Sequence, residues 1–165
     1  MQLCRECRYL YHSTNRIPCL SCTSSRLTIP CNDNLVEIIN KLLDMGFEVV
    51  SATCDIYDLM DYINGKVCHG KNVQIQIELG SSYSDIFTKL PPDWLTYEYH
   101  TIVGGNQIGN RCTGLSYTED FIPLDQEELE FATNLTISNL ELWLDNFDSD
   151  GVKSVLKLGG YATGQ

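Results

Sequence analysis

The sequence predicts an α+β protein: a small metal-held module at residues 1–30, then a two-layer α/β sandwich with an acidic helical C-terminal region. Three observations support this prediction. Two C-x2-C pairs lie near the N-terminus, helix-like and strand-like patterns alternate from 32 to 103, and residues 112–152 carry ten acidic side chains and no basic one. We expect the second domain to span 31–165, with its acidic helical part at about 119–158.

The N-terminal cysteines carry the most specific chemical signal. Cys4 and Cys7 form one pair, Cys19 and Cys22 form the other, and eleven residues separate the pairs. Each pair can bind one ion from a single tight turn, and two such turns complete the tetrahedral four-sulfur site typical of structural zinc. We therefore expect one structural Zn²⁺ and no catalytic metal, because four cysteine ligands leave no position for water.

The metal is expected to supply most of this module's stability, because it holds few apolar residues. Residues 8–11 alternate like a short strand, and residues 13–15 favour a turn. Disulfides are the alternative, but the paired spacing and the lack of an apolar leader disfavour them. That lack, and the absence of an apolar stretch of about 18 residues, predicts a cytoplasmic protein with no membrane partner.

The second domain is predicted to open with a helix that ends at Gly46, with Asn34 as its cap and Glu37 at the capping-box position. A strand at 47–50 follows. A second helix is expected at 55–64, where four apolar residues recur at helical spacing, namely Ile56, Leu59, Met60 and Ile63.

The best strand in the chain is residues 73–79, where apolar side chains alternate strictly with Gln, Gln and Glu. Such a strand predicts a sheet with one buried side and one solvent-facing or partner-facing side. We expect a short helix at 84–90 and a further strand at 95–103, which Gly104-Gly105 ends. Toward the C-terminus, three helix starts are predicted, at the capping boxes Asp125-x-x-Glu128 and Ser138-x-x-Glu141 and at Asp150.

Charge is unevenly distributed along the chain. The formal net charge is −11, composed of +3 over residues 1–30 and −14 over the remainder. Phosphate contacts need clustered Lys and Arg, so the acidic body is not expected to bind nucleic acid. The candidate contact surface is instead in the cysteine module, at Arg5, Arg8, Tyr9, Tyr11 and Arg16. Protein contact, nucleic-acid contact and a purely structural cap are the three interpretations of that module.

No catalytic motif stands out in the sequence. The other cysteines, Cys31, Cys54, Cys68 and Cys112, are expected to be packed thiols, since free cysteine is among the most buried residue types. Two alternatives remain open for them: a second metal site at Cys54, Cys68 and His69, or a nucleophile pair of Cys54 with His100.

Two resemblances extend this interpretation. Cys4-Arg5-Glu6-Cys7 with Cys19-Leu20-Ser21-Cys22 looks like the zinc-ribbon family. Residues 32–95, through the Gly46-Phe47 turn, the strand end at Cys54 and Leu90-Pro91-Pro92-Asp93-Trp94, resemble a group of small phage and prophage α/β proteins of mostly unknown activity. Members of that group often continue with Gly-His after this cysteine, where the present chain has Asp55-Ile56.

The leading functional hypothesis is a non-enzymatic protein-binding module. The phage resemblance implies an inhibitor or adaptor that acts on a host enzyme complex, such as an ATP-dependent protease like Lon, a polymerase or a restriction enzyme. The alternative is a nucleic-acid-associated regulator that uses the arginines of the cysteine module. An enzyme built on Cys54, Cys68, His69 or His100 is a weaker third hypothesis.

Overall fold

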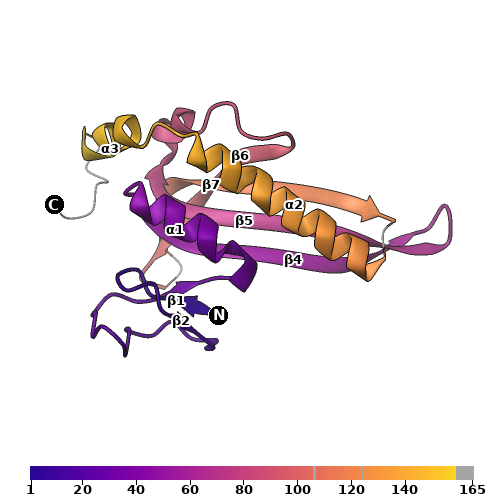
Figure 1. Cartoon of the computed structure of the whole chain (residues 1–165), viewed down its shortest axis with the longest axis horizontal. Helices are drawn as coiled ribbons and strands as arrows, with labels where there is room; N and C mark the ends of the chain where they lie inside the picture. The colour runs from indigo at the N-terminus through magenta and orange to yellow at the C-terminus, as the bar shows by residue number, and fades with distance from the viewer. Residues whose placement is uncertain (106, 124, 159–165) are drawn as a thin grey trace.

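The computed structural model describes residues 1–105, 107–123 and 125–158, and within them the fold is α+β. The described part contains two antiparallel sheets and three α-helices (Figure 1). A three-stranded sheet of order β2-β1-β3 belongs to the cysteine module, with strands Gln2–Leu3 (β1), Leu10–Tyr11 (β2) and Ile29–Pro30 (β3). A four-stranded sheet of order β4-β5-β7-β6 forms the body, with strands Val49–Asp61 (β4), Lys66–Gly80 (β5), Trp94–Val103 (β6) and Gln107–Ile122 (β7).

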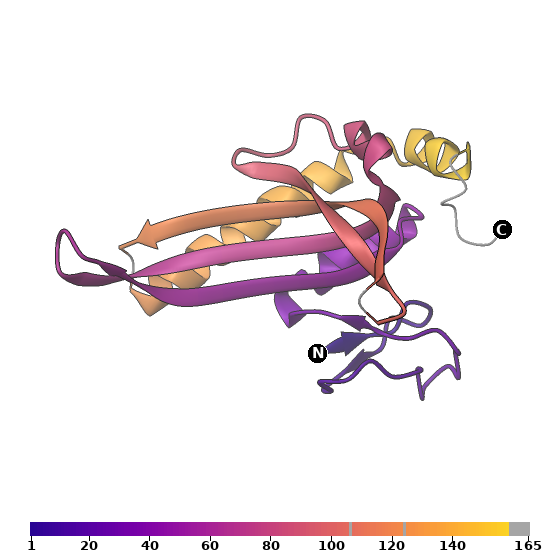
Figure 2. The same cartoon turned by 180° about the vertical axis from the view of Figure 1, so that it is seen from behind.

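The helices α1 (Val36–Asp44) and α2 (Gln126–Asp145) lie over one face of the large sheet (Figure 1). The other face of that sheet is turned to the viewer in Figure 2, with the helices behind it. Helix α3 (Ser149–Leu158) follows α2, and two 3₁₀ turns, η1 (Asp33–Leu35) and η2 (Ser81–Ile86), link the elements.

The core lies between the large sheet and the two helices. The predicted alternation at 73–79 is confirmed: Val73, Ile75, Ile77 and Leu79 are buried, and the residues between them face the other side. The same core cluster continues into the cysteine module, where it includes Leu3 and Ile29. The two parts of the chain are therefore packed against each other through apolar side chains.

The predicted helix at 55–64 is wrong, because these residues extend β4 and turn into β5. Strand β4 pairs antiparallel with β5 from Val49 to Asp61, with Tyr57 opposite Gly70 and Met60 opposite Val67. The backbone N–H and C=O groups of residues 66–72 need partners, and the long hairpin supplies them from β4. The apolar residues of this segment have helical spacing, but its backbone pairs with β5 as a strand.

The predicted C-terminal region also needs correction. Residues 119–122 belong to β7, and the helical part begins at Gln126. The Asp125–Glu128 capping box is confirmed, with Glu128 N donating to Asp125 Oδ1 at 2.9 Å. Residues 138–141 lie inside α2 instead of starting a helix.

Of three smaller helix predictions, one is confirmed and two need correction. Gly46, at φ +95°, ends α1 as predicted, since a left-handed conformation suits glycine. Asn34 caps no helix and lies within η1. The short helix expected at 84–90 is the 3₁₀ turn at Ser81–Ile86.

Candidate metal centre

Two backbone turns position the four cysteines. In the first, Arg8 takes a left-handed conformation, its N–H donates to the Cys4 carbonyl at 3.2 Å, and Cys4 N–H donates to the Tyr9 carbonyl at 2.9 Å. The second turn connects two short extended segments. These segments are joined by a β-bridge between Pro18 and Leu27 and by a 3.0 Å hydrogen bond from Thr28 N–H to the Ile17 carbonyl. Each turn therefore presents its two thiols toward one centre.

The four Sγ atoms of Cys4, Cys7, Cys19 and Cys22 all lie within 4.8 Å of one another, which confirms that the predicted ligands gather. The Cys4–Cys22 and Cys7–Cys19 sulfur distances are 3.7 and 3.5 Å. A tetrahedral site with metal–sulfur bonds of 2.3 Å has sulfur–sulfur edges of about 3.8 Å. A disulfide needs about 2.05 Å, so the spacing fits a shared ion and not a bond between sulfurs.

Hydrogen bonds around the sulfurs favour the thiolate at Cys19. The Tyr11 hydroxyl lies 3.0 Å from Cys19 Sγ, Cys22 N–H donates to the same sulfur at 3.5 Å, and Glu6 N–H donates to Cys4 Sγ at 3.4 Å. Burial raises the pKa of the Cys19 thiol, but hydrogen bonds with Tyr11, with the Cys22 and Ser21 N–H groups and with Cys4 outweigh burial and lower that pKa to about 6. A thiol that ionises near neutral pH is prepared to bind a metal ion. Burial raises the pKa of the Cys4 thiol. The Ser24 N–H bond lowers the pKa of Cys22, but burial and hydrogen bonds with the other three cysteines outweigh it and raise that pKa to about 12.

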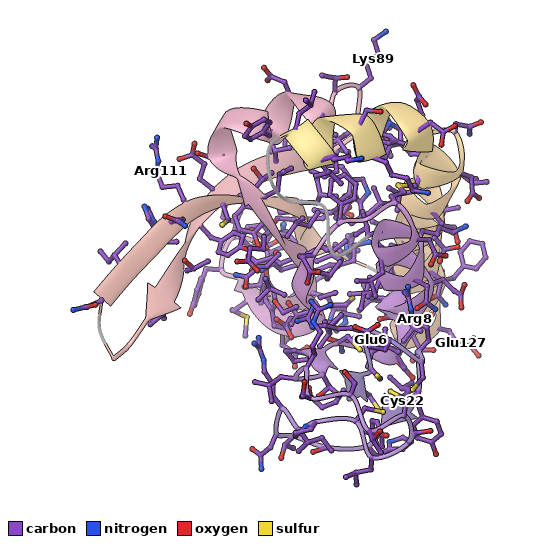
Figure 3. The ribbon with its side chains drawn as sticks, turned by 90° about the vertical axis from the view of Figure 1, so that its left-hand side faces the viewer. Glu6, Arg8, Cys22, Lys89, Arg111 and Glu127 are labelled. Carbon is purple, nitrogen blue, oxygen red and sulfur yellow. The ribbon has the colours of Figure 1, made fainter. Side chains whose placement is uncertain are left out.

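The donor set suits a soft or borderline cation, and the cluster could hold one ion through four thiolates. Cys4 and Cys19 are buried, whereas Cys7 and Cys22 are exposed, so the cluster can be reached from solvent. Figure 3 shows Cys22 in the module at one end of the molecule, below α1. When bound, the ion would cross-link the two turns and supply no open position for a substrate.

Arg5, a predicted partner-contact residue, is largely buried between the module and the body. Its side chain is 13% exposed; Nε donates to the Leu27 carbonyl at 3.0 Å, and Nη1 donates to the Val49 carbonyl and to Glu48. The guanidinium therefore joins the module to the first residues of β4. Glu48 is shared, since Arg26 also donates to it, at 2.6 Å.

The other two predicted arginines also contact the body. Arg8 donates to Asn40 Oδ1 at 3.2 Å and to Asp44 Oδ1 at 3.1 Å, both on α1, and Arg16 donates to the Val50 carbonyl at 3.3 Å. All three arginines therefore donate hydrogen bonds to the body of the same chain. Contact of these arginines with a partner stays a prediction.

The two predicted tyrosines differ in their surroundings. Tyr9 is 55% exposed and its ring lies 4.7 Å, between centroids, from that of Tyr11. The hydroxyl of Tyr11 accepts from Ser21 N–H at 3.0 Å and contacts Cys19, so this residue supports the cysteine cluster. Among the five predicted contact residues, Tyr9 and Arg16 are the exposed ones.

The remaining cysteines and histidines do not form a second cluster among the residues that the structure describes. Cys54 packs into the core on β4, while His100 is on β6, at the opposite edge of the sheet. His69 contacts Asp58, with 3.1 Å between Nδ1 and Oδ1. Cys31, Cys68 and Cys112 are buried.

The β4–β5 hairpin loop, residues 61–65, carries exposed apolar side chains outside the predicted contact surface. Ile63, which the helical spacing places on a helix face, lies in this loop. Tyr62 is 90% exposed and Ile63 is 95% exposed. Asp61 holds the loop: Oδ1 accepts from Ile63 N–H at 3.1 Å and Asn64 N–H at 3.2 Å, and Oδ2 accepts from the Asn64 amide at 2.7 Å. An Asp followed by Asn-Gly is the turn signal that could have located this loop.

The stem of this hairpin is braced on the face away from the helices. Tyr57 lies across Gly70, where an added Cβ would come within 2.1 Å of its ring, and its hydroxyl donates to Asp120 at 2.7 Å. The brace joins β4 to β7 across β5. The hairpin loop is therefore presented from an ordered stem.

Comparisons with known proteins give no relative: no family model, no curated protein and no solved structure matches the chain. Among the residues described, none of the helices has the combined length and apolar character that crossing a bilayer requires.

Proposed function

We propose that the chain is a non-enzymatic protein-binding module, in which one structural Zn²⁺ holds the N-terminal turns and the β4–β5 hairpin loop contacts a protein partner. The observation that carries the proposal is the loop itself. Two large apolar side chains, Tyr62 and Ile63, are at least 90% exposed on a turn that three hydrogen bonds to Asp61 organise. Amphipathic aromatic residues are enriched among those that carry the energy of protein interfaces.

Zinc is the proposed ion because four thiolates at tetrahedral spacing are its common structural ligand set. Thiolate ligands require reduced cysteines, which supports a reducing compartment such as the cytoplasm. With four protein ligands the ion is structural, and the site residues are Cys4, Cys7, Cys19 and Cys22. This assignment agrees with the zinc-ribbon resemblance.

A protein partner is favoured over nucleic acid by charge. Arg5, Arg8 and Arg16 donate hydrogen bonds within the chain. Residues 31–165 carry a formal charge of −14. Such a surface repels phosphate. The comparisons add no support to the phage resemblance, so the proposal does not name a host enzyme as the partner.

The test is affinity capture from a bacterial lysate with the full zinc-loaded chain, read by quantitative mass spectrometry. We expect at least one protein recovered in a saturable manner, and its loss with a Tyr62→Ser/Ile63→Ser variant. The matched control is Ile102→Ser/Ile108→Ser, which removes the exposed apolar pair at the end of the β6–β7 hairpin, 79% and 77% exposed. No saturable protein, or equal recovery with the Tyr62/Ile63 variant, would overturn the proposal.

A further inference from the structure

Helix α2 carries apolar side chains on two opposite sides. One side packs on the sheet through Leu129, Ile137, Leu140 and Leu144, all buried. Phe131, Leu135 and Leu142 are instead 73%, 53% and 61% exposed. At 3.6 residues per turn these three lie within about 40° of one another, roughly opposite the buried side. We call these three residues the outer stripe.

The outer stripe is hollowed at the N-terminal half of α2. A depression of about 560 Å³ is lined by Glu127, Glu128, Phe131, Ala132 and Leu135. The small side chain of Ala132 leaves room between the two larger apolar residues. A single apolar side chain from another molecule would fit between Phe131 and Leu135, in the manner of an anchor residue in a helix-binding surface.

Helix α2 carries acidic groups around this stripe and no basic residue of its own. Residues 126–145 contain five acidic side chains and no Lys or Arg, and the capping residue Asp125 adds a sixth negative charge. Figure 3 shows Glu127 projecting from the outer side of α2. Two lysines contact the helix, Lys41 at Asp145 and Lys71 at Thr136, and Lys71 is buried between α2 and the sheet.

These charges decide which molecule suits the stripe. A second copy would bring two acidic helices together, and an anionic membrane would be repelled for the same reason. A helix with an apolar face and flanking Lys or Arg would bury Phe131 and Leu135 while pairing with the acidic rim. Helix-in-groove recognition uses this combination of apolar anchors and charged flanks.

We propose that the outer stripe of α2 binds a basic amphipathic helix of another protein. The proposal rests on the proposed function only in that the partner is a protein, and it uses a surface separate from the hairpin loop. The apolar contact supplies affinity, and the acidic rim steers and selects the basic partner. Binding by the stripe and binding by the loop can therefore be tested separately.

The probe is a labelled synthetic peptide of about 18 residues with Leu and Lys at amphipathic helical spacing, long enough to form a helix on binding. Its matched control replaces every Lys with Glu. Fluorescence anisotropy with the full zinc-loaded chain should show binding of the Leu/Lys peptide only. The affinity should fall several-fold when salt rises from about 0.05 M to about 0.5 M, because salt screens exposed charges.

The variants locate the site. Phe131→Ser/Leu135→Ser should weaken peptide binding by about tenfold through loss of apolar burial, and Glu127→Gln by a smaller factor. Tyr62→Ser/Ile63→Ser should bind the peptide like the wild type, whatever the capture experiment shows. Circular dichroism melting checks that each variant folds, which we expect because the substituted side chains are exposed.

Four results would overturn the proposal: no binding of the Leu/Lys peptide, equal binding of the Leu/Glu peptide, equal affinity of the Phe131/Leu135 variant, or loss of binding in the Tyr62/Ile63 variant. Sedimentation that shows a dimer removed by Phe131→Ser/Leu135→Ser would assign the stripe to a second copy. Co-sedimentation with anionic vesicles that the same variant abolishes would assign it to a membrane. Both of those results also contradict a basic helix as the occupant.

Discussion

The cysteine module and the β4–β5 hairpin loop lie toward opposite ends of the molecule and use their side chains in opposite ways (Figures 1 and 2). In the module, Arg5 and Arg8 donate hydrogen bonds to the body and the four thiols face one another. In the loop, Tyr62 and Ile63 contact almost nothing in the chain. The difference indicates that these side chains of the module stabilise the fold, whereas the loop side chains are free for the partner contact that we propose.

The largest expected effect is loss of the metal from the module. Cys4→Ser removes one of four ligands, and because Leu3 and Ile29 belong to the main core, the destabilisation should reach the body. We expect loss of the bound metal and a fall of about 3 kcal/mol or more in the unfolding free energy. Elemental analysis and urea unfolding measure both. Cys112→Ser is the control that should keep one metal ion per chain, and a Cys4→Ser protein with full metal content would refute the four-cysteine metal site.

The next effect concerns the arginine that joins the module to the body. Arg5→Ala removes the guanidinium that donates to the Leu27 and Val49 carbonyls in a largely buried place, and leaves Glu48 with Arg26 as its donor. We expect a loss of about 2 kcal/mol in unfolding free energy, against less than about 1 kcal/mol for the exposed Arg16→Ala. Urea denaturation of both variants provides the comparison. Equal costs at the two positions would contradict the role of Arg5 in joining the module to the body.

A smaller effect tests the stem of the hairpin. Gly70→Ala places a Cβ 2.1 Å from the Tyr57 ring, so the ring must move from the position in which it donates to Asp120. We expect a loss of about 1–2 kcal/mol by overpacking. In a Tyr57→Ala background the same substitution should cost less, since the clash is absent. If both backgrounds lose the same stability, Tyr57 does not brace the stem.

The smallest effect is a pH-dependent loosening of the hairpin loop. Hydrogen bonds from the Asn64 side chain and backbone lower the pKa of Asp61 below its usual value. The loop is therefore fully held above the unfolded-state pKa of an aspartate, about 3.9, and is released as pH falls through the lower folded pKa. NMR should show the Ile63 and Asn64 amide signals moving together at that acidic pH. In Asp61→Asn the same movement should be absent; its persistence would mean that another group controls the loop.

The cysteine site could be predicted because its information is local: ligand type and spacing set the geometry within each turn. Helix α1 could also be predicted, because its apolar residues recur at helical spacing and form the face that is buried in the core. The 55–64 segment carries a similar apolar spacing, but residues 55–61 are strand because residues 66–72 pair with them. The apolar spacing does not reveal that pairing, and the Asn64-Gly65 turn signal is a local sign of it. The contacts of Arg5 and Arg8 join residues more than 30 positions apart, so spacing could not show that these charges are used within the chain.

The most direct test of the contrast between the two ends is hydrogen exchange on the full zinc-loaded chain, alone and bound to the protein recovered by capture. We predict added protection in the hairpin at residues 59–67, with residues 1–30 unchanged by the partner. Protection confined to residues 1–30 would contradict the account. It would place recognition on the cysteine module, around Tyr9, instead of on the surfaces that the module holds in position.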